Sequence, residues 1–210
     1  MGQYYKPVLI SKTRKIRFLY SHHYDNGLKL TEHSWIGNNF VNAVQSQILG
    51  NPQRVGWVGD YAMDLMDDEQ VWGVKPYQRK IPEKKLRKIW RICWEKEGKH
   101  EITPPPMDGF DLEHSKWFLV NHTQKLFVDI EAFVKKNKTY YKWYDGEVAM
   151  CLNPLPLLTA CGNGCNGGDY YKCYPDYDKV GTWAFDLIEL TEKKPDGYEA
   201  AEYEFREEEK

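Results

Sequence analysis

The chain has 210 residues, a formal net charge of −2 and an aromatic content of 15%. A chain of this length buries enough surface to fold without disulfide bonds, and its aromatic content excludes a disordered or low-complexity protein. The nearly balanced charge gives no overall reason to expect nucleic acid as a partner.

The start of the chain and its cysteines bear on where the protein works. The opening residues, MGQYYKPVLISKTRK, lack the apolar segment of a secretory signal, and no apolar run approaches the roughly 18 residues that cross a bilayer. Five cysteines are an odd number in a chain without an export signal, so reduced thiols are expected. We therefore expect a cytoplasmic protein that does not associate with membranes.

Residues 1–102 are predicted to form a β-rich half that contains two helices. Residues 3–20 have the composition of two strands around a polar turn. Residues 38–49 have helical apolar spacing and a terminating glycine, and residues 54–62 (RVGWVGDYA) favour an apolar strand. The clearest helix is 82–97, which has a proline near its start, an apolar stripe and a glycine just past its end.

One face of the helix at 82–97 is positively charged, with Lys84, Lys88 and Arg91 at helical spacing. A solvated helix surface and an anion-binding patch both fit these charges. We expect the solvated surface and keep the patch as an alternative.

Residues 103–111 (TPPPMDGFD) are a stiff, proline-rich connection to a second β-rich half at 112–198. This half is predicted to contain two hairpins and a further apolar strand, at 116–130, 139–152 and 180–190. Residues 199–210 form an acidic tail whose last residues we expect to be mobile. The two halves together are expected to make one compact domain.

Four short matches recur in the same order on the two sides of the proline-rich connection. They pair ISKTRKI with VNHTQKL, YDNG with YDGE, IGN with CGN, and GWVGD with GTWAFD. This order predicts a duplicated β-rich unit whose copies pack about a pseudo-twofold axis. The turns at Gly37-Asn38 and Gly162-Asn163 would then be equivalent, as would Asp60 and Asp186. The predicted fold class is α+β, with two β-rich halves and two main helices.

The segment CGNGCNGGDYYKC, residues 161–173, combines cysteines with glycines in a way that raises the question of a metal site. Cys161 and Cys165 have the spacing of a zinc-ligand pair, but Cys173 follows after seven residues instead of two to four. We therefore expect no cofactor and keep a structural zinc ion held by these cysteines as the alternative.

The glycines of the same segment suit phosphate binding, because successive backbone N–H groups can form an anion-binding nest. The tyrosine that follows them could stack on a base, although the segment matches neither the P-loop nor the dinucleotide motif. The ligand-binding residues predicted in this way are Asn38, Asp60, Gly162, Asn163, Gly164, Asn166, Gly167, Gly168, Asp169 and Tyr170. The alternative is a tight glycine-rich connection between strands that binds nothing.

Candidate catalytic residues are few. The chain has six histidines and many acids, but none lies in a nucleophile elbow, an HExxH motif or a triad signature. The candidates are His33 and Asp60, either of which could act as a base. We expect binding rather than catalysis, and the question of an enzyme stays open.

Several landmarks occur in one order along the chain: MGQYY at the start, YDNGLKLTEHSWIGN at 24–38, WVGDYA at 57–62, FLVNHT at 118–123, and NPLPLLTACGNG at 153–164 with GGDYY after it. In these landmarks the chain resembles a family of uncharacterised proteins from bacteria and their phages. The resemblance covers most of residues 1–190 and implies a mobile-element setting, but no established activity. The family pattern has a basic residue where Cys165 stands, which implies an anion-binding loop rather than a zinc site.

The leading hypothesis is a non-enzymatic binding protein that sequesters a small phosphorylated, nucleotide-derived ligand in anti-defence. The first alternative is a protein–protein inhibitor that covers a host defence enzyme. The second alternative is a small hydrolase.

Overall fold

The structure, a computed structural model, describes residues 3–63, 81–95, 98–114, 116–143, 146–162 and 175–206. A mixed eight-stranded sheet has the order β10-β5-β4-β9-β3-β1-β2, with β8 paired to β3. Its strands are β1 (Tyr5–Ile10), β2 (Ile16–Phe18), β3 (Gln53–Gly59), β4 (Phe118–Asn121), β5 (Leu126–Asp129), β8 (Ala160–Cys161), β9 (Leu187–Thr191) and β10 (Glu199–Ala200). A separate sheet joins β6 (Thr139–Trp143) to β7 (Gly146–Met150). The predicted α+β class is confirmed.

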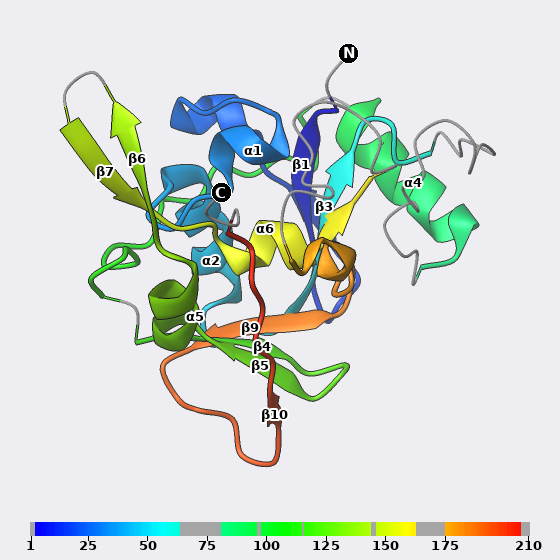
Figure 1. Cartoon of the computed structure of the whole chain (residues 1–210). Helices are drawn as coiled ribbons and strands as arrows, with labels where there is room; N and C mark the ends of the chain where they lie inside the picture. The colour runs from blue at the N-terminus through cyan, green and yellow to red at the C-terminus, as the bar shows by residue number, and fades with distance from the viewer. Residues whose placement is uncertain are drawn as a thin grey trace.

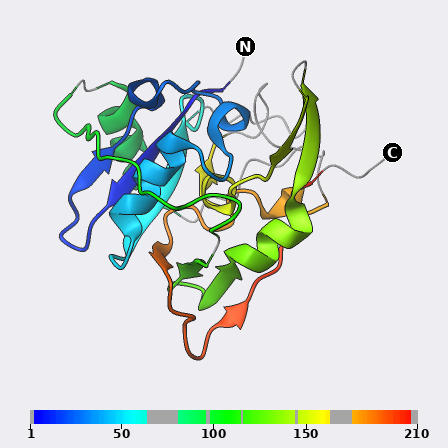
Figure 2. The same ribbon diagram turned by 90° about the vertical axis from the view of Figure 1, so that its left-hand side faces the viewer.

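Helices cover both faces of the part of the sheet that contains β1 and β3 (Figures 1 and 2). The α-helices are α1 (Leu30–His33), α2 (Asn39–Ile48), α4 (Glu83–Trp94), α5 (Ile130–Asn137) and α6 (Pro154–Leu158), and short 3-10 turns occur at Ser21–Tyr24 and Tyr177–Lys179. Among the residues that the structure describes, no helix has the length and apolar character needed to cross a membrane.

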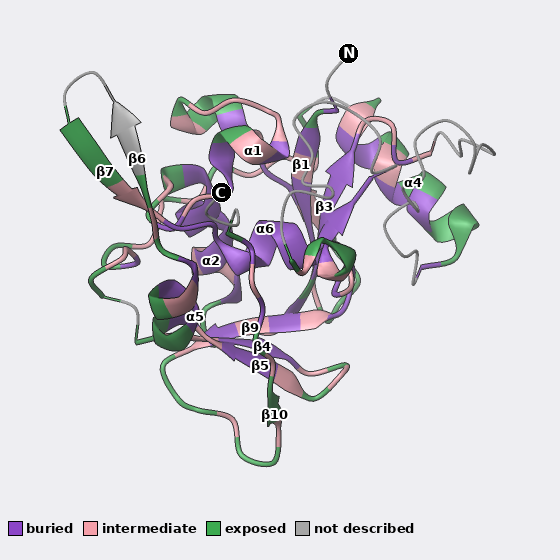
Figure 3. Cartoon of the chain, in the orientation of Figure 1, coloured by how far each residue is buried: buried purple, intermediate pink, exposed green. Residues whose placement is uncertain are grey.

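Two apolar cores lie on opposite faces of β1 and β3, because alternate side chains of a strand point to opposite faces. Leu9 and Trp57 face the core that α2 and α6 cover, whereas Val8 and Val58 face the core that α4 covers. Both strands are therefore buried almost throughout, as Figure 3 shows. This double cover explains the uninterrupted apolar runs at 7–10 and 55–59.

Both predicted helices are confirmed, as are the predicted hairpins. The side chain of Asn38 accepts hydrogen bonds from the first-turn N–H groups of α2 and so fixes its start. In α4, Leu86, Ile89 and Cys93 are buried as the predicted stripe requires, and the basic residues of the other face are exposed. The helix ends at Trp94, a few residues short of the predicted end.

The strand order has a symmetry that bears on the predicted duplication. The trio β2-β1-β3 and the trio β5-β4-β9 each consist of a hairpin whose first strand pairs antiparallel with a later strand. The two trios meet where β3 pairs with β9. However, Asp60 directly follows β3 whereas Asp186 directly precedes β9, so these two residues are not in equivalent places. The duplication itself stays a prediction.

The proline-rich connection and the acidic tail are more firmly packed than their compositions suggest. The segment 103–111 runs along α2, where Nδ2 of Asn42 donates a hydrogen bond to the carbonyl of Phe110. In the tail, Tyr203 and Phe205 are buried, and Asn137 of α5 bonds the backbone of both. The last four residues, 207–210, lie outside the described part of the chain.

Candidate functional site

Most of the predicted phosphate-binding loop lies outside the described part of the chain. Asn163, Gly164, Asn166, Gly167, Gly168, Asp169 and Tyr170 lie outside the described residues, and so do the candidate zinc ligands Cys165 and Cys173. The anion-binding nest therefore stays a prediction. Only the start of the loop, at Cys161 and Gly162, is described.

Gly162 lies beside the end of β3. Strand β8 pairs parallel with β3, with Cys161 opposite Val58, so Gly162 comes next to Gly59. The buried side chain of Gln3 fills the space where either glycine would otherwise carry a Cβ atom. These two glycines thus serve close packing around Gln3, and the loop begins next to Asp60.

Asp60 holds the end of β3 to the N-terminal segment. Its Oδ1 accepts hydrogen bonds from the backbone N–H groups of Tyr4 and Tyr61, both at 3.0 Å. Its backbone carbonyl accepts from Nε1 of Trp90 in α4 at 2.8 Å. The carboxylate is therefore engaged in fixing the backbone, which is a structural role.

The side chain of Asn38 is engaged at the start of α2. Its Oδ1 caps α2 through Phe40 and Val41, and its Nδ2 donates to Oδ1 of Asn26 at 2.6 Å. Both ends of the amide are used in this way, and this arrangement fixes the approach of the chain to α2.

His33 is a core residue, and the structure gives it no room to act as a base. Its side chain is fully buried, and its Nε2 accepts a hydrogen bond from Nε1 of Trp57 at 2.9 Å. The other nitrogen, Nδ1, therefore carries the proton and donates to the carbonyl of Gly27 at 3.1 Å. Burial lowers the pKa of His33 to about 4, against a smaller raising effect of the bond to Gly27. The imidazole stays neutral and out of reach of a ligand.

The described cysteines are buried. Cys161 lies in the apolar core beneath α4, together with Cys93, and burial raises the pKa of Cys93 to about 12. Within the described ranges no three His, Cys, Asp or Glu side chains come together as a metal site would require.

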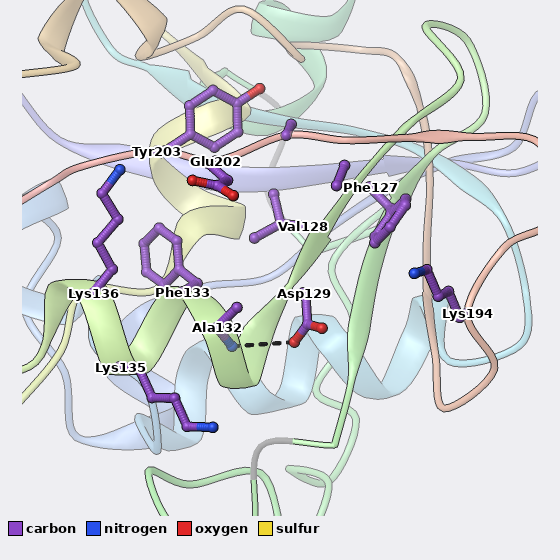
Figure 4. A pocket seen from close by; sticks show the side chains of 12 residues that line it. Phe127, Val128, Asp129, Ala132, Phe133, Lys135, Lys136, Lys194, Glu202 and Tyr203 are labelled. Atoms are coloured by element: carbon purple, nitrogen blue, oxygen red, sulfur yellow. Dashed lines mark hydrogen bonds between the residues drawn. The ribbon is translucent and has the colours of Figure 1, made fainter.

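A groove that the sequence did not reveal lies on the described surface (Figure 4). It has a volume of about 560 Å³ and lies between α5, strand β5 and the segment that follows β10. Its lining divides into an apolar set and a charged set: Phe127, Val128, Ala132, Phe133, Ala200, Ala201 and Tyr203, against Asp129, Lys135, Lys136, Lys194 and Glu202.

The floor of the groove is apolar. Val128, Phe133 and Tyr203 line this floor (Figure 4), and each belongs to the core beneath, where the ring of Tyr203 stacks on that of Phe205. Burial raises the pKa of Tyr203 to about 12, so its hydroxyl stays protonated. Oδ1 of Asp129 accepts a hydrogen bond from the N–H of Ala132 at 3.1 Å and so caps α5.

Three lysines stand around the rim at different sides (Figure 4). Lys135 is paired with Glu131 at 2.7 Å, and Lys136 lies 3.8 Å from Glu204. The ammonium group of Lys194 lies over the ring of Phe127, 5.5 Å from its centroid, and has no carboxylate partner among the described residues. The groove thus offers an apolar floor and cationic groups above it.

Comparison of the chain with protein-family models, with curated proteins and with solved structures found no match. The chemistry of the groove has to be inferred from its own residues.

Proposed function

We propose that this protein binds a small phosphorylated ligand that carries a flat aromatic part, such as a nucleotide, and that it does so in the groove between α5 and the segment after β10. The observation that carries this proposal is the combination of an aromatic floor with a lysine rim in one hollow of about 560 Å³. That volume is in the range of small-molecule sites.

Each part of the ligand has a counterpart in the groove. Aromatic rings such as those of Phe133 and Tyr203 give an apolar surface for a base. The ammonium group of Lys194 is the cation best placed to receive a phosphate, because Lys135 and Lys136 already face carboxylates. In the mobile-element setting that the sequence resemblance implies, such a binder would sequester a nucleotide signal.

Binding without turnover is the simplest role for this arrangement. The two candidate bases, His33 and Asp60, are engaged in the core and at the end of β3. Of the two carboxylates that line the groove, that of Asp129 caps α5. We therefore do not propose the hydrolase.

Filling the groove should abolish binding without unfolding the protein. We expect Ala132→Trp to remove the calorimetric binding of AMP and ATP, because the indole would occupy the space above Phe133, and Ala132 is exposed. Lys194→Gln should weaken ATP binding about fivefold, as expected for one exposed ion contact. Lys193→Gln removes the same charge one residue away, outside the lining, and should leave the affinity unchanged.

The proposal fails if neither nucleotide binds the wild-type protein at millimolar concentration, or if Ala132→Trp binds as tightly as the wild type. Thermal melting of each variant checks that it is folded.

A second function, inhibition of a protein partner, is favoured by the hairpin of β6 and β7. This hairpin projects from the body of the molecule as a separate sheet (Figures 1 and 2). Tyr140 and Val148, which it carries, are 61% and 49% exposed. Exposed apolar side chains on a projecting arm are typical of protein-binding surfaces.

Removing these apolar groups tests the second function. Tyr140→Ser combined with Val148→Ser should change the stability by less than about 1 kcal/mol, since both residues are at the surface. Tyr177→Ser, at another exposed tyrosine, is the control. If the arm binds a partner, the wild type and the control should retain the same proteins from host lysate, and the double variant should not retain them. Equal retention by all three would contradict it.

A further inference from the structure

A second cavity, outside the groove, lies where the turn before β9 meets the first turn of α4. Its volume is about 280 Å³, and its polar lining consists of Arg54, Lys85, Thr123 and Asp186. These residues come from β3, α4, the turn between β4 and β5, and the turn before β9. Nothing in the sequence indicated that these four residues lie together, because they are far apart along the chain.

Asp186 supplies a carboxylate that neighbouring side chains hold in place. It is 5% exposed, and its Oδ2 accepts hydrogen bonds from Nδ2 of Asn121 at 2.9 Å and from Nε2 of Gln124 at 2.5 Å. Asn121 is itself fully buried, and its Oδ1 accepts from the backbone N–H groups of Thr123 and Gln124. The turn between β4 and β5 is thus built around this carboxylate.

The residue before Asp186 has an unusual backbone. Phe185 has a φ of 62°, a left-handed conformation that is rare for a large side chain. It is held there by a hydrogen bond from its N–H to the carbonyl of Val55, and its own carbonyl accepts from Nη1 of Arg54 at 2.9 Å. Such backbone strain is concentrated at functional sites. Here it places the Arg54 guanidinium at the wall of the cavity.

Two cations, Arg54 and Lys85, line the same cavity as this carboxylate. Neither Arg54 nor Lys85 has a carboxylate partner among the described residues. By contrast, two other cations of α4 are paired, Arg87 with Glu83 and Arg91 with Glu95. The first turn of α4, which reaches the cavity through Pro82, has no side-chain cap. The positive charge at this end of the cavity is therefore available to an anion.

We propose that this cavity binds a small molecule that carries both an oxyanion and a hydroxyl group, such as a phosphorylated polyol. The oxyanion would lie between Arg54 and Lys85. The hydroxyl group would donate to Asp186 and accept from the Thr123 hydroxyl. This site is independent of the nucleotide groove, from which it differs in every lining residue.

Amide NMR shifts of the full chain test this proposal with three probes: inorganic phosphate, glycerol 3-phosphate and glycerol. We expect glycerol 3-phosphate to shift the amides of Thr123, Phe185 and Leu187, with an affinity about tenfold higher than that of inorganic phosphate. Glycerol alone should cause no shift. The amides of Ala132 and Tyr203 in the groove should stay in place, which separates this site from the groove.

Variants locate the charge. Lys85→Gln should weaken glycerol 3-phosphate binding about fivefold, and Lys88→Gln, one turn further along the exposed side of α4, should not. Arg54→Lys keeps the charge without the fork of the guanidinium, and should weaken binding while leaving the chain folded. The proposal is overturned if no probe shifts the cavity amides, or if Lys85→Gln and Lys88→Gln act equally. Equal affinity for phosphate and glycerol 3-phosphate would overturn the role given to Asp186.

Discussion

Lowering the pH from about 7 to about 4 should destabilise the protein by about 3 kcal/mol through His33 alone, because burial lowers the pKa of this residue to about 4. In the unfolded chain its pKa is close to 6.5, so the unfolded state binds a proton first as the pH falls. The stability that neutral His33 confers is therefore complete above pH 6.5 or so. It is lost progressively below that value, and the loss levels off below about 4.

Urea unfolding at a series of pH values measures this effect, with His33→Gln as the matched variant. Glutamine can still accept from Trp57 and donate to Gly27, but it cannot be protonated in this range. The variant should be less stable at neutral pH, and its stability should fall less steeply between pH 6.5 and 4. Because all other acids are shared, the difference between the two curves belongs to His33. Parallel curves would show that His33 does not stay neutral in the folded protein.

Local signals made much of the fold predictable. The helix α2 begins at an asparagine cap and ends before a glycine, and α4 has a buried stripe at helical spacing. Other elements gave no such signal. Strands β8 and β10 have two residues each, and their place is set by pairing with β3 and β5. No pattern of that length can be recognised in a sequence.

Helix α5 was missed for a different reason. It follows β5 without a break, so apolar residues of the strand run directly into those of the helix. The sequence LFVDIEAFV reads as a continuation of a hairpin unless Asp129 is recognised as a helix cap, which it is. Missing α5 also hid the groove, which this helix forms together with a segment some 70 residues further along the chain.

The candidate site shows the limit of reasoning from residue types. His33, Asn38 and Asp60 are polar residues near glycines, which is what a site requires. The polar atoms of His33 and Asp60 are engaged by long-range contacts, with Trp57 and with the N-terminal segment, whereas Asn38 caps α2 locally. The start of the glycine loop lies at the end of β3, since β8 pairs with β3, but the site predicted there stays a prediction. The sequence could suggest which residues have functional chemistry, but not which of them already have partners.

Gly56→Ala should destabilise the protein by about 3 kcal/mol, because the new methyl group would enter a space that an aromatic ring fills. A Cβ atom on Gly56 would lie 2.6 Å from Cζ of Phe185. The ring has little room to withdraw, since Phe185 is 5% exposed and lies in the core beneath α4. Its backbone is also fixed, by the hydrogen bonds to Val55 and Arg54.

A double-mutant cycle identifies the ring as the cause. Phe185→Gly removes the ring and allows the φ of 62° without strain, so part of the stability lost with the buried ring is recovered. In that background Gly56→Ala should have little effect, and the coupling between the two positions should be about 3 kcal/mol. If Gly56→Ala destabilises both backgrounds equally, the glycine serves the pairing of β3 with β1 rather than the ring. A full coupling would instead show that Gly56 and Phe185 act as one unit, in which the glycine makes room for the residue whose strained backbone positions Arg54 and Asp186.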